Sequence, residues 1–151
     1  MKRFGEDKMQ LEKVFTKKGD SGNTVVPAYG NVRKGHPSVK LLGKIDTAIV
    51  SIGWLKVCEW SSAESIQKNL SFIAGCVSGA VPPDKAALKK VEAALDSVEA
   101  QMNEVITLIG EKDITDFMLP GKNEREIRFH EARVSIREIE VCFSLLSSKE
   151  L

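Results

Sequence analysis

The chain has 151 residues, of which 42% are hydrophobic and 28% are charged. This balance favours one soluble, compact domain over residues 1–151 and excludes an intrinsically disordered chain. The 22 basic and 21 acidic side chains leave a net charge of +1, so no overall field attracts nucleic acid or an anionic membrane. We therefore expect any anion to be bound at a local site.

Three cysteines, Cys58, Cys76 and Cys142, are widely spaced and form no C-x-x-C motif. Reduced, buried thiols in a cytoplasmic protein are expected rather than disulfides or a zinc site. The two histidines, His36 and His130, lie too far apart in the sequence to indicate a metal site. The N-terminus lacks a signal-peptide pattern, and no run of residues is long and apolar enough to span a membrane.

Residues 1–37 are expected to be mostly non-helical, and a glycine-rich stretch over residues 15–24, FTKKGDSGNT, is their most informative part. Gly19 and Gly22 allow a tight turn whose N–H groups face an anion, and two lysines precede them. A phosphate chain would fit such a loop. The stretch does not match the P-loop pattern, however, and taken alone it is more often a plain surface turn.

Two helices are expected in the middle of the chain. The first covers about residues 38–59, and its internal glycines, Gly43 and Gly53, indicate close packing against a neighbour. The second begins at a capping box formed by Ser61 and Glu64 and ends before the two prolines that follow it. The apolar faces that predict them are Leu42, Ile45, Ile49 and Ile52 in the first helix, and Ile66, Leu70, Ile73 and Val77 in the second.

A third helix is expected over about residues 84–109, and a fourth from a cap at Asn123 and Glu126 to about Ser147. Four long helices joined by short loops predict an all-α fold, an antiparallel four-helix bundle. The supporting apolar positions are Leu88, Val91, Leu95, Val98, Met102, Val105 and Ile109, and then Phe129, Ala132, Ile136, Ile139, Phe143 and Leu146.

A polar line runs along the fourth helix, one residue away from its apolar face. His130, Arg133, Arg137 and Glu140 are spaced by three or four residues, and Asp46 has the same offset on the first helix. Charges that border a core are costly unless paired, so these groups should meet each other, another subunit or a ligand phosphate. A solvated stripe of ion pairs explains the arginines about equally well, and His130 is more often a structural histidine.

Taken together, these features resemble one family, the PduO-type ATP:cob(I)alamin adenosyltransferases. The matches run in order from about Val14 to Glu140, and as a set they are far more specific than any single motif. The matching residues are Thr16, Lys17, Gly19, Asp20, Gly22 and Thr24 in the loop, Lys34 before the first helix, Gly43 and Asp46 within it, Gln67, Leu70, Phe72 and Gly75 in the second helix, and Phe117, Leu119, Pro120, Gly121, His130, Ala132, Arg133, Arg137 and Glu140 toward the end.

The resemblance implies a homotrimer of cobalamin adenosyltransferase-like (ferritin-like) bundles with active sites between subunits. In that family the glycine loop wraps the triphosphate of ATP together with Mg²⁺, and reduced cobalamin lies beside it. Cobalt(I) attacks the ribose 5′-carbon and triphosphate leaves, which gives adenosylcobalamin. Because cobalt is itself a strong nucleophile, such a protein mainly positions its substrates and stabilises the leaving charge.

The resemblance also implies roles for individual residues. Arg137 would neutralise the departing triphosphate, and Asp46 and Arg133 would form an inter-subunit pair beside the site. Phe117 would press on the lower face of the corrin. The residues implied to bind the substrates or to shape the loop are Thr16, Lys17, Lys18, Gly19, Asp20, Gly22, Thr24, Lys34, His130 and Glu140.

Two arginines of the family's R-R-x-E-R pattern are replaced here by Glu138 and Val141, and the family continues into a further helix beyond the position of Leu151. These differences leave two alternatives open. One is a degenerate member that binds nucleotide or corrinoid without catalysis, and the other is a structural helical-bundle interaction protein. The ordered run of matches argues against the second.

Overall fold

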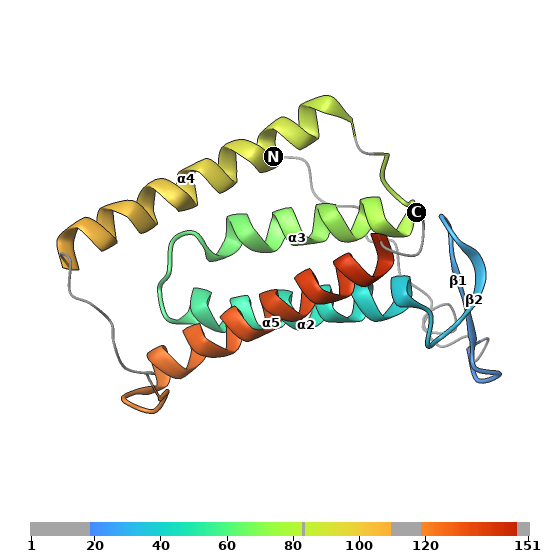
Figure 1. Ribbon diagram of the computed structural model, residues 1–151, viewed down its shortest axis with the longest axis horizontal. Coiled ribbons are helices and arrows are strands. Elements are labelled where there is room, and N and C mark those ends of the chain that lie inside the picture. The colour runs from blue at the N-terminus through green and yellow to red at the C-terminus, as the bar shows by residue number, and fades with distance from the viewer. Residues whose placement is uncertain (1–18, 83, 110–118, 148–151) are drawn as a thin grey trace, which may run out of the picture.

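The computed structural model describes residues 19–82, 84–109 and 119–147. Within these ranges lie four helices and a two-stranded antiparallel sheet (Figure 1). The expected all-α bundle is confirmed, whereas the short hairpin was not anticipated. The elements are β1 (Asn23–Val26), β2 (Gly30–Arg33), α2 (Pro37–Val57), α3 (Ala63–Ser78), α4 (Lys85–Ile109) and α5 (Glu124–Ser147).

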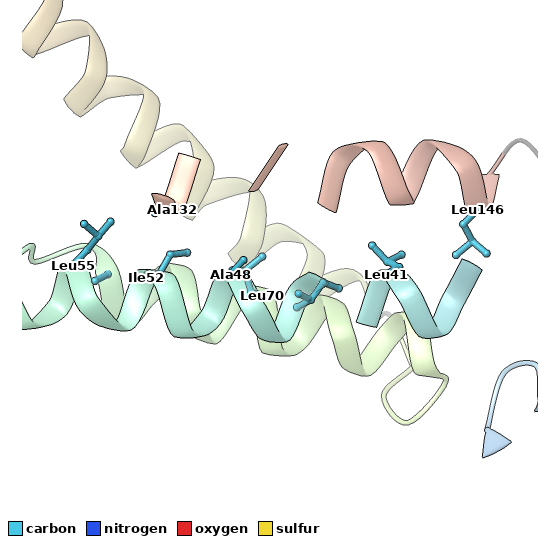
Figure 2. Close-up of a cluster of buried hydrophobic side chains, with 9 residues drawn as sticks. Leu41, Ala48, Ile52, Leu55, Leu70, Ala132 and Leu146 are labelled. Carbon is cyan, nitrogen blue, oxygen red and sulfur yellow. The ribbon is translucent and has the colours of Figure 1, made fainter. Parts of the chain in front are cut away.

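Helix α2 is the centre of the fold, because it packs against both α5 and α3. Its core residues Leu41, Ile45, Ile52 and Leu55 are at most 2% exposed. Figure 2 shows Leu41, Ile52 and Leu55 among the clustered side chains, with α5 contributing residues such as Leu146. Full burial of a leucine or isoleucine side chain contributes roughly 1.5–3 kcal/mol, so this face of α2 supplies much of the stability.

Small side chains allow α2 and α5 to approach closely. Ala48 on α2 and Ala132 on α5 are buried, and so are Ser51 and Ser135. The hydroxyl oxygens of the two serines lie 3.2 Å apart, and the Ser135 hydroxyl donates to the carbonyl of Glu131 at 2.9 Å. These buried hydroxyl groups are therefore satisfied, and the contact costs no unpaired polar atom.

The buried face of α5 departs from the predicted face at two positions. Ile136 and Phe143 were expected in the core but are 39% and 51% exposed. Ser135 is buried instead, and Cys142 packs against the core cluster. The reason is the close contact with α2, which selects small side chains that a pattern of large apolar residues does not reveal. The predicted positions that do contact the core are Phe129, Ala132, Ile139 and Leu146.

The glycines of α2 differ in their surroundings. A Cβ at Gly53 would lie 3.2 Å from Nε2 of Gln67, whose amide donates to the carbonyl of Ile49 at 2.8 Å. This confirms the close packing expected there, and the contact ties α3 to the backbone of α2. At Gly43 an added Cβ would meet nothing within 4 Å, so the same expectation is wrong for Gly43.

The start of α3 differs from its prediction. The N-cap is Ser62 rather than Ser61, and the carboxylate of Glu64 pairs with Lys56 and Lys68, each at 2.8 Å. These hydrogen bonds, that from Lys56 first, lower the pKa of Glu64 to about 2. The expected capping box is wrong because two ammonium groups compete better for this carboxylate than a backbone N–H does.

The cap predicted for α5 is confirmed. The side-chain oxygen of Asn123 accepts a hydrogen bond from the backbone N–H of Glu126 at 2.9 Å, and the carboxylate of Glu126 accepts one from the N–H of Lys122 at 2.8 Å. Two N–H groups at this end of the helix are thereby satisfied. None of the described helices combines the length and apolarity needed to cross a membrane.

Helix α4 contacts α3 and runs at a slant above it (Figure 1). Val91 of α4, together with Leu70 and Ile73 of α3 and Ile136 of α5, lines a largely apolar cavity of about 540 Å³. Ile136 is therefore partly exposed because it faces this cavity rather than the tight contact between α2 and α5.

Candidate functional site

A hairpin carries the glycine loop. Val26 pairs with Gly30 at the end of the ladder, and the N–H of Tyr29 donates to the carbonyl of Val26 at 2.9 Å. Gly30 has a φ of 72°, so a turn begun by Pro27 is closed by a residue in the left-handed region. This geometry is typical of three-residue hairpin loops and explains why proline and glycine occupy these positions.

The tip of the hairpin is fixed to the end of α3. The N–H of Ala28 donates to the carbonyl of Ser78 at 2.9 Å. The next residue, Gly79, ends the helix with a φ of 77°, and a Cβ there would lie 2.9 Å from the Cβ of Ala28. Glycine is thus required twice, for its backbone conformation and for the close approach of the hairpin.

The base of the hairpin brings the predicted loop residues together. The N–H of Gly22 donates to the carbonyl of Gly19 at 3.2 Å, and the N–H of Lys34 donates to the carbonyl of Gly22 at 2.9 Å. A Cβ at Gly19 would lie 3.1 Å from Nζ of Lys34, so this side chain lies over the loop. Asp20 is exposed and Thr24 is half-buried in β1. The loop therefore combines a tight glycine turn with a neighbouring ammonium, a combination that suits a phosphate.

Some of the predicted site residues lie outside the described residues, and their roles stay predictions. They are Thr16, Lys17, Lys18 and Phe117.

The polar line of α5 is mostly exposed. Arg133, Arg137 and Glu140 face solvent, and only His130 borders the core as expected, with 22% of its side chain exposed. Nε2 of His130 lies 3.9 Å from a carboxylate oxygen of Glu126. The arginines are exposed because α2 packs against the other side of the helix, through its small residues.

Arg133 and Arg137 line an open cavity of about 440 Å³ on the surface formed by α2 and α5. Lys44 and Glu138 also line it, and their Nζ and Oε2 atoms lie 2.9 Å apart. The hydrogen bond to Glu138 raises the pKa of Lys44, against a smaller opposing effect of burial. The sequence had indicated no role for Lys44, because its partner lies 94 residues away. The rest of the wall is Val134, Val141 and Cys142.

Asp46 lies on an exposed part of α2, one residue after the buried Ile45. Within the described ranges, neither Asp46 nor Arg133 nor Arg137 has an ion-pair partner in the same chain. Two unpaired guanidinium groups beside a cavity can bind an anion through several charge-assisted hydrogen bonds.

A second, almost wholly apolar cavity of about 320 Å³ lies on the other side of the same arginines. Its wall includes Trp60 and Phe129, whose rings meet edge to face with centroids 5.4 Å apart. Arg133 and Arg137 line this cavity as well. The arginine edge of α5 therefore separates a charged cavity from an apolar one.

The two groups of candidate residues lie on different elements. The glycine loop and Lys34 belong to the hairpin, which lies at one end of the helices (Figure 1). Arg133 and Arg137 lie near the middle of α5. Within the described residues, the structure brings Lys34 over the glycine loop and places Arg133 and Arg137 beside the same cavities, and the two groups lie on different elements.

A family model described as cobalamin adenosyltransferase matches residues 14–150. The chain belongs to this family. The enzyme class expected from the sequence, a cobalamin adenosyltransferase, is the class of this family. No match was found among curated proteins.

Solved structures with the same fold include variants of the PduO-type ATP:corrinoid adenosyltransferase from Lactobacillus reuteri. Two of them, complexed with cobalamin and ATP, are 21% identical to this chain and have a TM-score of 0.69. The matched region covers 89% of this chain, and it covers 78% of one of those chains and 76% of the other. A third, complexed with ATP, is 22% identical and has a TM-score of 0.68. The matched region covers 89% of this chain and 78% of that chain. At this identity the likeness establishes the fold of the adenosyltransferase.

Proposed function

We propose that this chain transfers the 5′-deoxyadenosyl group of ATP to the cobalt of reduced cobalamin at sites shared between copies in a homotrimer. The observation that carries this proposal is that two groups of cationic residues lie on different elements of the chain. One is the glycine loop with Lys34, and the other is the exposed edge with Arg133 and Arg137. Support comes from the family match and from related structures complexed with cobalamin and ATP.

The triphosphate of ATP binds at the glycine loop in this proposal. The ammonium of Lys34, which lies over the tight turn, faces the phosphate oxygens. Mg²⁺ accompanies the nucleotide, and the exposed carboxylate of Asp20 is a ligand of the type that Mg²⁺ prefers. The loop residues Thr16, Lys17, Lys18 and Thr24 belong to the same proposed site.

The reaction needs no side-chain nucleophile. Reduced cobalamin supplies the electron pair that forms the bond between cobalt and the 5′-carbon, and the bond between that carbon and the triphosphate oxygen breaks. Triphosphate leaves with the bonding electrons, so negative charge grows on its oxygens. Arg137 stabilises that charge through its guanidinium, which is the main catalytic contribution of the protein. Phe117 contacts the corrin, and His130 and Glu140 support the nucleotide side of the site.

Exposed apolar side chains provide a surface on which copies associate. On α2, Val50, Trp54 and Val57 are 66%, 43% and 72% exposed and follow a four-three spacing along one face. On α5, Val134 and Val141 are 49% and 57% exposed and lie seven residues apart. Apolar stripes of this kind on adjacent helices are typical of subunit interfaces.

The same interface accounts for two charges that have no partner within the described part of the chain. Asp46 on α2 of one copy pairs with Arg133 on α5 of the next. Arg128 lies over the ring of Trp54 at 4.3 Å and fixes its orientation within the apolar stripe. The cytoplasm is the proposed location, because three free, half-buried cysteines suit a reducing compartment.

The test is to incubate the protein with ATP, Mg²⁺ and chemically reduced cobalamin and to follow conversion to the adenosyl form by its absorption spectrum. We expect conversion by the native chain and a loss of about 100-fold in kcat for Arg137→Ala, the cost of removing one donor to developing charge. Arg125→Ala is the matched control, since Arg125 is also exposed on α5 but lines a different cavity. ATP binding without conversion would contradict the proposal and favour a non-catalytic member of the family.

A further inference from the structure

The cavity beside the two arginines contains a third cation and a carboxylate. Lys44 extends from α2, and Glu138 directly follows Arg137 on α5. Nζ of Lys44 lies 2.9 Å from Oε2 of Glu138, and their side chains are 40% and 44% exposed. The net charge of the charged side chains that line this cavity is +2 at neutral pH, from Arg133, Arg137, Lys44 and Glu138.

Glu138 alone would weaken any anion site at this place. A carboxylate beside a bound polyphosphate repels it, and open solvent screens only part of that repulsion. None of the residues three or four positions away on its own helix is basic, because these positions hold Val134, Ser135, Val141 and Cys142. The ammonium that pairs with Glu138 comes from the neighbouring helix α2 instead.

We propose that Lys44 is a positioning residue for polyphosphate binding. It holds the carboxylate of Glu138 and thereby preserves the positive charge of the arginine cavity, the one that Lys44 and Glu138 line together with Arg133 and Arg137. The inference rests on the proposed function, because it assigns the triphosphate of ATP to a site completed by this cavity. It adds a residue that works through Glu138 rather than by contact with the substrate. The cavity thus contains a carboxylate together with the ammonium group that offsets its negative charge.

A purely structural role for this ion pair makes a different prediction. If the pair only joined α2 to α5, removal of either partner would weaken the fold in the same way and leave anion affinity unchanged. The chain offers a matched control in Lys56 and Glu64, which join α2 to α3 at 2.8 Å and are 56% and 52% exposed. Neither residue of this control pair lines the arginine cavity.

The test uses inorganic tripolyphosphate with Mg²⁺ as the probe and measures its dissociation constant calorimetrically at low ionic strength. The net charge of the cavity is +1 in Lys44→Ala, +3 in Glu138→Gln and +2 in the double variant. We expect Lys44→Ala to bind the probe about threefold more weakly and Glu138→Gln about threefold more tightly than the native protein, because one charge acts at a distance through screened solvent. The double variant should bind with nearly native affinity. Lys56→Ala should bind like the native protein, and all shifts should shrink in high salt.

The inference is overturned if Glu138→Gln weakens binding as Lys44→Ala does, if the double variant binds as weakly as Lys44→Ala, or if the native chain does not bind the probe. Steady-state kinetics of adenosyl transfer give a second readout. The KM for ATP should follow the same order, and kcat should fall far less than in Arg137→Ala, since neither residue contacts the reacting atoms.

This design separates the two proposals. Conversion of cobalamin by the native chain without the order of affinities would overturn only the role of Lys44. The order of affinities without conversion would overturn the transfer activity and support the role of Lys44 in binding polyphosphate.

Discussion

The attachment of the hairpin to α3 can be tested at a single glycine. Gly79 ends α3 with a φ of 77°, and its Cα faces Ala28 at the tip of the hairpin. Gly79→Ala adds a Cβ that would lie 2.9 Å from both the Cβ and the nitrogen of Ala28. The substitution therefore strains the end of the helix and separates the hairpin from it.

The expected cost has two parts. A non-glycine residue in the left-handed region costs roughly 1–2 kcal/mol. Loss of the hydrogen bond from Ala28 to Ser78, now 2.9 Å long, costs a further 0.5–1.5 kcal/mol approximately. We expect Gly79→Ala to lower the free energy of unfolding by about 1.5–3.5 kcal/mol, the sum of these terms.

Urea denaturation followed by circular dichroism measures the loss, and amide hydrogen exchange shows whether the hairpin detaches. Gly30→Ala is the matched control, since Gly30 has a φ of 72° but open space around its Cα. For Gly30→Ala, the free energy of unfolding should fall by only roughly 1–2 kcal/mol, the cost of backbone strain. Equal losses for the two variants, with unchanged exchange of the β1 and β2 amides in Gly79→Ala, would refute the attachment. Because the hairpin carries the glycine loop that is proposed to bind the triphosphate, the KM for ATP should also rise in Gly79→Ala.

Three further predictions concern the core, an ion pair and the interface. Leu41→Ala should cost about 2–5 kcal/mol in urea denaturation, because Leu41 is fully buried in the core, and a smaller loss would mean that the site collapses. The lowered pKa of Glu64 stabilises the fold above the ordinary carboxyl pKa, and this contribution disappears as the pH falls toward 2. Glu64→Gln should therefore flatten the rise of Tm between about pH 2 and 5, and an unchanged slope would contradict the assignment. Trp54→Asp, with Leu88→Asp on α4 as control, should dissociate the assembly in analytical ultracentrifugation, and a native sedimentation coefficient would exclude this face as the interface.

Much of the helical architecture could be predicted because the information is local. The first helix was expected to begin at about Ser38 and begins at Pro37, and the Asn123 cap forms as predicted. These features depend on residues within one turn of each other. The turn at Gly19 and Gly22 was predictable in the same way, whereas Lys34 reaches it through the hairpin and was expected only from the family resemblance.

The features that the sequence could not reveal depend on contacts between distant segments. The strands have only four residues each, too few for a convincing alternation, although β-branched residues and the turn at Pro27 and Gly30 are a weak signal in retrospect. Glu64 matches a capping box in sequence, but Lys56 on another helix takes its carboxylate. The Lys44–Glu138 pair likewise exists only because α2 and α5 lie side by side.

The central claim is that the hairpin of one copy and the arginine edge of another form one site, and subunit mixing tests it most directly. Lys34→Ala and Arg137→Ala should each be nearly inactive alone. When equal amounts of the two variants are assembled together, sites that join a native hairpin to a native arginine edge make up about a quarter of the total in a random cyclic trimer. We expect adenosyl transfer to recover to about that fraction of the native rate, by the same count. Activity that stays at the level of the single variants would contradict the claim.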